Sequence, residues 1–96
     1  MATFISLINF TDQGIRGVKD SPARYEAFKA SAEKLDLQIK NVYYTVGNYD
    51  LVLILEGNEE AVTTALLKAG ALGNVRTQTL RGFTIDEFRR ILGKAF

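Results

Sequence analysis

The residues with the clearest potential for chemistry are Tyr49 and Asp50, which end the stretch Gly47-Asn48-Tyr49-Asp50. A carboxylate at this position could bind an amine or a substrate at the mouth of a cleft. The other interpretation is structural, because an aspartate in a turn readily accepts backbone N–H bonds while the tyrosine packs on the hairpin. We favour the structural interpretation and keep both residues as candidates for a binding site.

A second group of candidates lies on the segment before this turn. Tyr43 and Thr45, with Asn41 and Tyr44, could line a pocket on an open face of a sheet. Tyrosine and threonine are also common in ordinary strands, because their side chains suit a half-buried pleated surface. We therefore place the strand interpretation first and the pocket second.

Two polar side chains on a later segment complete the candidate site. Arg76 and Gln78 are two residues apart, so they share one face of a strand. A guanidinium can hold a carboxylate ligand through two parallel hydrogen bonds. Arg76 could also pair with Asp50 or Glu56 across an interface between two chains, and we favour that role. If the protein binds an effector with a carboxylate, we expect Arg76 to hold it, with Tyr43 and Asp50 nearby.

The residue types that are absent narrow the possible chemistry. The sequence contains no cysteine and no histidine, so it offers no thiolate ligand, no cysteine nucleophile and no imidazole base. We expect neither a metal nor a cofactor. An enzyme built on this chain would have to use Tyr43 or Asp50 as its catalytic base.

The charge balance and length set further bounds. The chain has 12 basic and 11 acidic residues, and a net charge of +1 argues against a nucleic-acid surface. No apolar run reaches the length of a membrane span, and the N-terminus has no signal-peptide pattern, so we expect a cytoplasmic protein. The 96 residues suit one domain over 1–96.

Apolar spacing predicts the elements that must position the candidate side chains. Strands are expected over 2–10, 38–46, 50–56 and 75–82, with Gly47-Asn48 as the turn between the second and the third. Helices are expected over 12–36 with a break near Asp20, from 58 to about 70, and from 84 to 96.

Capping residues support these helix starts. In the first long helix, Tyr25, Phe28, Ala32 and Leu35 form a stripe that should be buried, and Arg24 lies away from it. The last helix begins with a Thr-x-x-Glu capping box. The expected caps are Thr11 or Asp12, Ser21 before Pro22, Asn58, and Thr84 with Glu87.

The strand patterns also predict the topology. The strands over 2–10 and 50–56 are apolar on both faces and should be central, whereas the strands over 38–46 and 75–82 are mixed and should be edges. Right-handed crossovers then give an antiparallel sheet in the order 4-1-3-2, which is the ferredoxin-like βαββαβ arrangement of the α+β class, with an added C-terminal helix. In the second strand we expect Val42, Tyr44 and Val46 on one face and Ile39, Asn41, Tyr43 and Thr45 on the other.

The predicted fold leaves one face of the sheet without helices. Because both central strands place aliphatic side chains on that face, we expect it to pack against a second copy of the chain in a two-fold dimer. The C-terminal helix would close the rim or reach the neighbour. Contacts through edges or helices could extend the dimer to higher oligomers.

The stretches Val42–Asp50, Gly73–Thr79 and Asn9–Gly14 together resemble the GYD domain family, with Gly47-Asn48-Tyr49-Asp50 as its Gly-x-Tyr-Asp form. The resemblance covers essentially the whole chain and implies a ferredoxin-like fold of the dimeric α+β barrel type. The hairpin and the Gly-x-Val-Arg-Thr-x-Thr strand are also similar to the effector-binding domains of leucine-responsive, feast/famine regulators. Those domains imply dimerisation through sheets and binding of small effectors such as amino acids.

The function we expect is that of a small non-catalytic module that forms homo-oligomers and binds a small ligand between two sheets. Its candidate ligand-binding residues are Tyr43, Thr45, Tyr49, Asp50, Arg76 and Gln78. The alternative is a cofactor-independent enzyme, monooxygenase-like or isomerase-like, of the dimeric α+β barrel group. We expect no nucleic acid and no membrane as partner.

Overall fold

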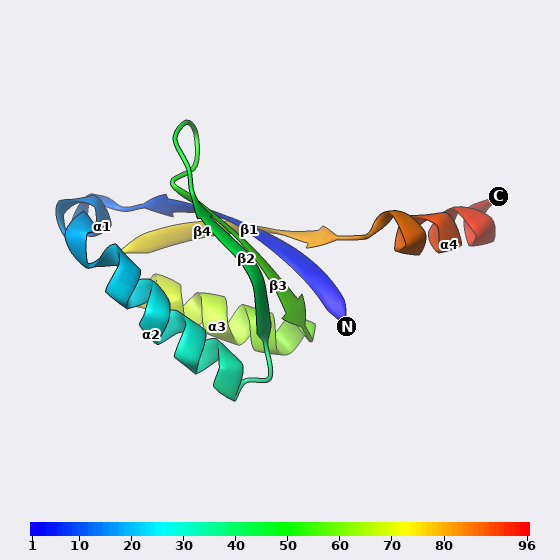
Figure 1. Ribbon diagram of the computed structural model, residues 1–96, viewed down its shortest axis with the longest axis horizontal. Coiled ribbons are helices and arrows are strands. Elements are labelled where there is room, and N and C mark those ends of the chain that lie inside the picture. The colour runs from blue at the N-terminus through cyan, green and yellow to red at the C-terminus, as the bar shows by residue number, and fades with distance from the viewer.

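A four-stranded antiparallel sheet forms the centre of the fold, and two long helices lie against one of its faces (Figure 1). The computed structural model describes all residues from Met1 to Phe96. The strands lie side by side in the order β2-β3-β1-β4, which is the predicted order 4-1-3-2 counted from the other edge, so the ferredoxin-like α+β fold is confirmed. In chain order the elements are β1 (Ala2–Phe10), α1 (Asp12–Arg16), a 3-10 turn η1 (Val18–Asp20), α2 (Ser21–Lys34), β2 (Gln38–Tyr44), β3 (Leu51–Gly57), α3 (Glu59–Ala71), β4 (Val75–Gly82) and α4 (Ile85–Ala95).

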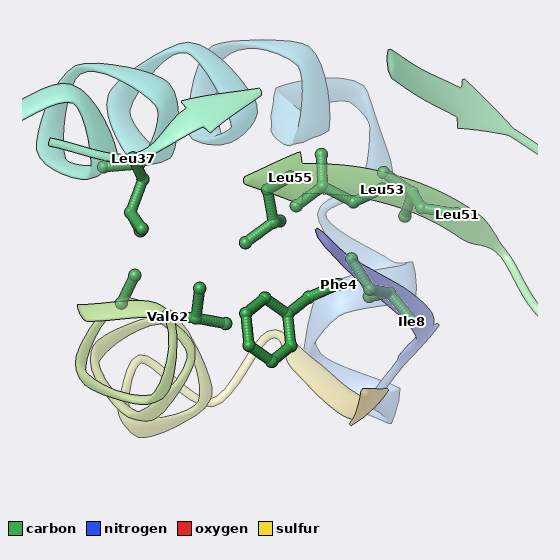
Figure 2. Close-up of a cluster of buried hydrophobic side chains, with 9 residues drawn as sticks. Phe4, Ile8, Leu37, Leu51, Leu53, Leu55 and Val62 are labelled. Atoms are coloured by element: carbon green, nitrogen blue, oxygen red, sulfur yellow. The ribbon is translucent and has the colours of Figure 1, made fainter. Parts of the chain in front are cut away.

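The core lies between the sheet and the helices α2 and α3. Alternate residues of the central strand β3 are buried on this side, and Leu55 is 1% exposed. Figure 2 shows Val62 of α3 pointing toward Phe4 of β1, so the helix and the sheet both contribute side chains to the core. The nine residues of this cluster are Phe4, Ile8, Ala32, Leu37, Leu51, Leu53, Leu55, Val62 and Ala65.

The edge strand β2 departs from the predicted alternation. Ile39 pairs with Leu55 and Asn41 pairs with Ile54, so Lys40 between them is the extra residue of a bulge. The bulge shifts the side-chain alternation by one residue. Ile39 therefore packs against the core on the helix-covered face, and the prediction that it shares a face with Asn41 was wrong.

The hairpin between β2 and β3 is longer than a two-residue turn. β2 ends at Tyr44, two residues before the predicted end, and the loop is closed by the Thr45 N–H, which donates to the Asp50 carbonyl at 2.8 Å. The Thr45 hydroxyl also donates to the Tyr49 carbonyl at 2.6 Å. Gly47 has a φ of 119°, which explains the glycine in the loop.

The segment after β1 is broken into three helical pieces. Thr11 caps α1 as predicted, because its hydroxyl accepts the Gly14 N–H at 3.0 Å. Ser21 is not a cap, however, because η1 runs directly into α2 and leaves no extended residue at the junction. Its buried hydroxyl instead shares a 2.8 Å hydrogen bond with the Tyr44 hydroxyl, which ties α2 to β2.

The C-terminal helix α4 extends away from the sheet (Figure 1). The predicted capping box is present, with the hydroxyl of Thr84 and the carboxylate of Glu87 each accepting the other residue's backbone N–H. The Thr84 N–H lowers the pKa of Glu87 by stabilising its ionised form. No residue of α4 is buried, and its large apolar side chains are all exposed: Ile85, Phe88, Ile91 and Leu92, followed by the terminal Phe96.

Candidate functional site

One face of the sheet is open and lies opposite α2 and α3 (Figure 1). The pairing register places the predicted site residues Tyr43, Arg76 and Gln78 on this face. No helix covers this face, so its central aliphatic side chains are only half-buried in the single chain. The pairing register aligns them in two rows, Tyr43–Val52–Leu7–Gln78 and Asn41–Ile54–Ile5–Leu80. Each row is apolar in the middle and more polar or exposed at the edge strands.

Tyr49 connects the hairpin to the far edge of the sheet. Its hydroxyl donates to the Gln78 side-chain carbonyl at 3.1 Å. Because β1 lies between β3 and β4, this hydrogen bond passes across β1 at one end of the open face. Tyr49 and Gln78 are therefore brought together, although 29 positions separate them in the sequence.

Asp50 joins the same end of the sheet to β1. One oxygen of its carboxylate accepts the Phe10 N–H at 2.9 Å, and its own N–H donates to the Ile8 carbonyl at 2.8 Å. These bonds extend the pairing of β3 with β1 by one residue beyond the strand. They favour a structural role for Asp50, with a neighbouring strand rather than the turn supplying the N–H donor.

Arg76 and Gln78 lie on the open face of β4, where Arg76 pairs in register with Asn9. Arg76 forms no ion pair with Asp50, Glu56 or any other acidic residue of its own chain. The single salt bridge of the structure joins Arg89 and Asp86 on α4. The positive charge of Arg76 is thus exposed beside Gln78 without a carboxylate partner.

The remaining candidates lie apart from this end of β4. Tyr43 is 58% exposed on the open face of β2, and β3 and β1 separate it from β4. Thr45 is engaged in closing the hairpin loop. Tyr44 pairs with Leu51 and so faces the helices, which makes its predicted place in an open-face pocket wrong.

A second contact brings together two segments that carried the sequence resemblance. The Thr11 N–H donates to the Asn74 carbonyl at 3.0 Å, and the Thr11 hydroxyl donates to the Gly73 carbonyl at 2.6 Å. The Gln13 amide donates to the Leu72 carbonyl at 3.1 Å and to the Asn74 side chain at 2.9 Å. We call this contact the α1 clasp, and it fixes the start of β4 beside the end of β1.

The helix-covered side contains a feature that sequence reasoning missed. An apolar cleft of about 520 Å³ lies between α2, α3 and the sheet, and 13 of its 19 lining residues are hydrophobic. Arg24 lines it and donates to the carbonyls of Gly17 and Gly14 at 2.9 and 3.3 Å. The prediction that Arg24 simply points away from the buried side of α2 was therefore wrong, and its position four residues before Phe28, on the same side of the helix, was the available signal.

No group of three or more aspartate or glutamate side chains is arranged to hold a metal ion. None of the helices combines the length and the apolar character needed to cross a membrane.

Comparison with known proteins identifies one family model and several similar structures. The model of the GYD domain matches residues 4–92, whereas no curated protein sequence matches the chain. TTHA0845 from Thermus thermophilus is 26% identical, with a TM-score of 0.54 over 88% of this chain and 95% of that one.

Feast or famine regulators show the same fold. FFRP-DM1 is 21% identical, with a TM-score of 0.59 over 86% of this chain and 100% of that one. The feast or famine regulatory protein Rv3291c from M. tuberculosis, complexed with L-methionine, is 18% identical, with a TM-score of 0.54 over 88% of this chain and 51% of that one. The predicted similarity to the effector-binding domains of such regulators is confirmed at the level of the fold.

Proposed function

The chain belongs to the GYD domain family, and we propose that it is a non-catalytic module that pairs with a second copy of itself through the open sheet face and binds a small carboxylate ligand there. In this proposal the 96 residues act as one domain. The observation that carries it is the apolar, uncovered face of the two central strands.

The energetics of the open face support pairing. Ile5, Leu7, Val52 and Ile54 form a contiguous aliphatic patch, and apolar surface gains about 25 cal/mol for each Å² removed from water. A contiguous patch of this kind on a small protein usually marks an interaction site. A two-fold axis over the patch would cover both copies with the same residues. The exposed apolar side chains of α4 would find cover against the neighbouring copy in the same assembly.

The charge at one end of the face supports a carboxylate ligand. Arg76 has no acidic partner in its own chain, and Gln78 beside it is already oriented by the Tyr49 hydroxyl. A guanidinium and an amide side by side suit a ligand with a carboxylate and a second polar group. L-methionine, the ligand of the regulator with the same fold, is therefore the first compound to test.

The pairing is tested by placing a charge in the centre of the patch. We expect the natural chain to scatter light as a dimer at micromolar concentration and Leu7→Lys to shift it toward the monomer. Leu67→Lys is the matched control, because Leu67 is 70% exposed on α3 and away from the open face. A natural chain that is monomeric, or a Leu7→Lys variant that dimerises like the control, would contradict the proposal.

The ligand is tested by a thermal-shift screen of L-amino acids and small carboxylates. A true ligand should raise the melting temperature of the natural chain and of Arg16→Ala, a control on the exposed surface of α1, but not of Arg76→Ala. If a ligand raises the melting temperature of Arg76→Ala as much as that of the natural chain, Arg76 does not contribute to the binding site.

A further inference from the structure

The cleft on the helix side lies on the opposite side of the sheet from the proposed dimer surface. Its floor is formed by core residues of the central strands, among them Ile8, Leu51 and Leu53. Phe28 on α2 and Leu66 on α3 form its walls. Several residues on its rim are exposed, including Leu72 at 70%, so the cleft opens to solvent between the two helices.

Small side chains explain why the cleft is not filled. Ala27 and Ser31 line it from α2, and Ala65 and Ala69 line it from α3. Side chains of this size leave part of the space between the two helices and the sheet unfilled. The volume of about 520 Å³ lies in the range of roughly 300 to 1,000 Å³ that is typical of small-molecule sites.

The two cationic side chains of the cleft lie at one end. Because α2 leaves the end of β1 and α3 returns to the start of β4, the first turns of α2 lie beside the last turns of α3 (Figure 1). This places Arg24, Lys68 and Asn74 at the same end of the lining. Neither Arg24 nor Lys68 forms an ion pair with an acidic side chain.

We propose that this cleft binds a single-chain amphiphile with an anionic head, of the fatty-acid class. The acyl chain lies over Leu53 and between Phe28 and Leu66, and the carboxylate faces Lys68 and Arg24. The site is separate from the open sheet face, so this proposal can be tested independently of the proposed dimer and its ligand.

The charge of the cleft end argues against α4 of a second copy as the occupant. The side chains of α4 carry three positive and two negative charges, on Arg89, Arg90, Lys94, Asp86 and Glu87. A helix with this net positive charge gains nothing from a cationic rim, whereas a carboxylate head does.

The first experiment measures binding of decanoate and decyltrimethylammonium by calorimetry, each below its micellar concentration. We expect decanoate to bind and the cationic amphiphile to bind at least about 10-fold more weakly. Shortening the chain from decanoate to octanoate should weaken binding by about 2- to 4-fold for each methylene removed. No decanoate binding, or equal binding of both head groups, would overturn the proposal.

Methyl NMR of the same samples locates the bound chain. Decanoate should shift the methyl signals of Leu53 and Leu66 and leave those of Ile5 and Ile54 on the open face unchanged. The reverse pattern would place the amphiphile on the dimer surface and overturn the assignment. Decanoate that instead shifts the methyl signals of Ile85 and Ile91 in the full chain would assign it to α4 and overturn the proposal.

Variants then test the cleft itself. Ala69→Leu on α3 and Ala27→Leu on α2 each place a larger side chain in the cleft, and each should weaken decanoate binding at least about 10-fold. Ala30→Leu, on the exposed side of α2, is the control and should have no effect on binding. Lys68→Gln should weaken binding by about 2- to 5-fold and Lys29→Gln should not. Thermal unfolding confirms that each variant is folded. Unchanged binding in both cleft-filling variants would exclude the cleft as the site.

Discussion

Gly14 offers a sharp test of the α1 clasp, because its backbone lies directly against the turn before β4. A Cβ atom at Gly14 would be 2.8 Å from the carbonyl carbon of Asn74 and closer still to its oxygen. Both atoms belong to the backbone, so no side-chain rotation can relieve the overlap. Gly14→Ala must therefore push α1 away from the start of β4.

The cost follows from the hydrogen bonds that hold the clasp. Displacing α1 weakens the two bonds from Thr11 to the Asn74 and Gly73 carbonyls and the bonds donated by Gln13. At about 1 kcal/mol each, the loss of two or three bonds costs about 2 to 3 kcal/mol. Alanine regains up to about 1 kcal/mol of helix propensity over glycine, so the net loss is about 1 to 2 kcal/mol.

The assay is urea unfolding followed by circular dichroism, with all chains at one concentration because assembly affects apparent stability. Gly70→Ala is the matched control: Gly70 lies within α3, and nothing is within 4 Å of a Cβ placed there. We expect Gly14→Ala to lower the free energy of unfolding and Gly70→Ala to raise it by up to about 1 kcal/mol. The melting temperature should fall by about 4 to 8 °C per kcal/mol for Gly14→Ala.

Equal effects of the two substitutions would refute this reasoning. If Gly14→Ala stabilises the chain like Gly70→Ala, α1 is not clamped against the turn in solution. A loss of stability without loss of amide protection at Thr11 would also show that the cost arises elsewhere, because the Thr11 N–H is the donor of the central clasp bond.

Three further predictions concern local contacts. Asp50→Ala removes the acceptor of the Phe10 N–H and should cost about 1 to 3 kcal/mol in urea unfolding, whereas Asp50→Asn keeps an acceptor and should cost less; equal costs would contradict the contact. The Thr84 N–H lowers the pKa of Glu87, so its capping contribution to α4 should be intact at neutral pH and lost as the pH falls below the usual glutamate value of 4.5 through the lowered pKa. An NMR titration of the Thr84 amide with its midpoint at or above 4.5 would disprove this. Gly73→Ala should cost about 1 kcal/mol or more in thermal unfolding, because its φ of 86° suits glycine, and an unchanged melting temperature would count against that strain.

Local patterns in the sequence were sufficient for much of the fold. The bounds of β1 and β4, the capping box of Thr84 and Glu87, and the central position of β3 all follow from residues close together in the chain. The alternation of side chains along a strand and the capping of a helix depend on neighbours within about four positions, so both can be predicted directly from the sequence. The strand order followed because two apolar faces require a central strand and crossovers are right-handed.

Contacts between distant segments were decided only by the tertiary structure. The bulge at Lys40 depends on how β2 pairs with β3, and it reversed the predicted face of Ile39. Serine is a common helix-capping residue, yet the hydroxyl of Ser21 forms a hydrogen bond with the Tyr44 hydroxyl because packing brings α2 against β2. Local spacing carries no information on such pairings, since they depend on register and on the approach of whole elements.

The candidate site divides in the same way. The sequence by itself determined which side chains could bind a carboxylate, and the placement of Arg76 and Gln78 on one face needed only the two-residue period of a strand. Only the tertiary structure brought Tyr49 to Gln78 across β1 and engaged Asp50 with Phe10. Only the packing of α2, α3 and the sheet created the cleft, because alanines that permit close helix packing can equally line a cavity.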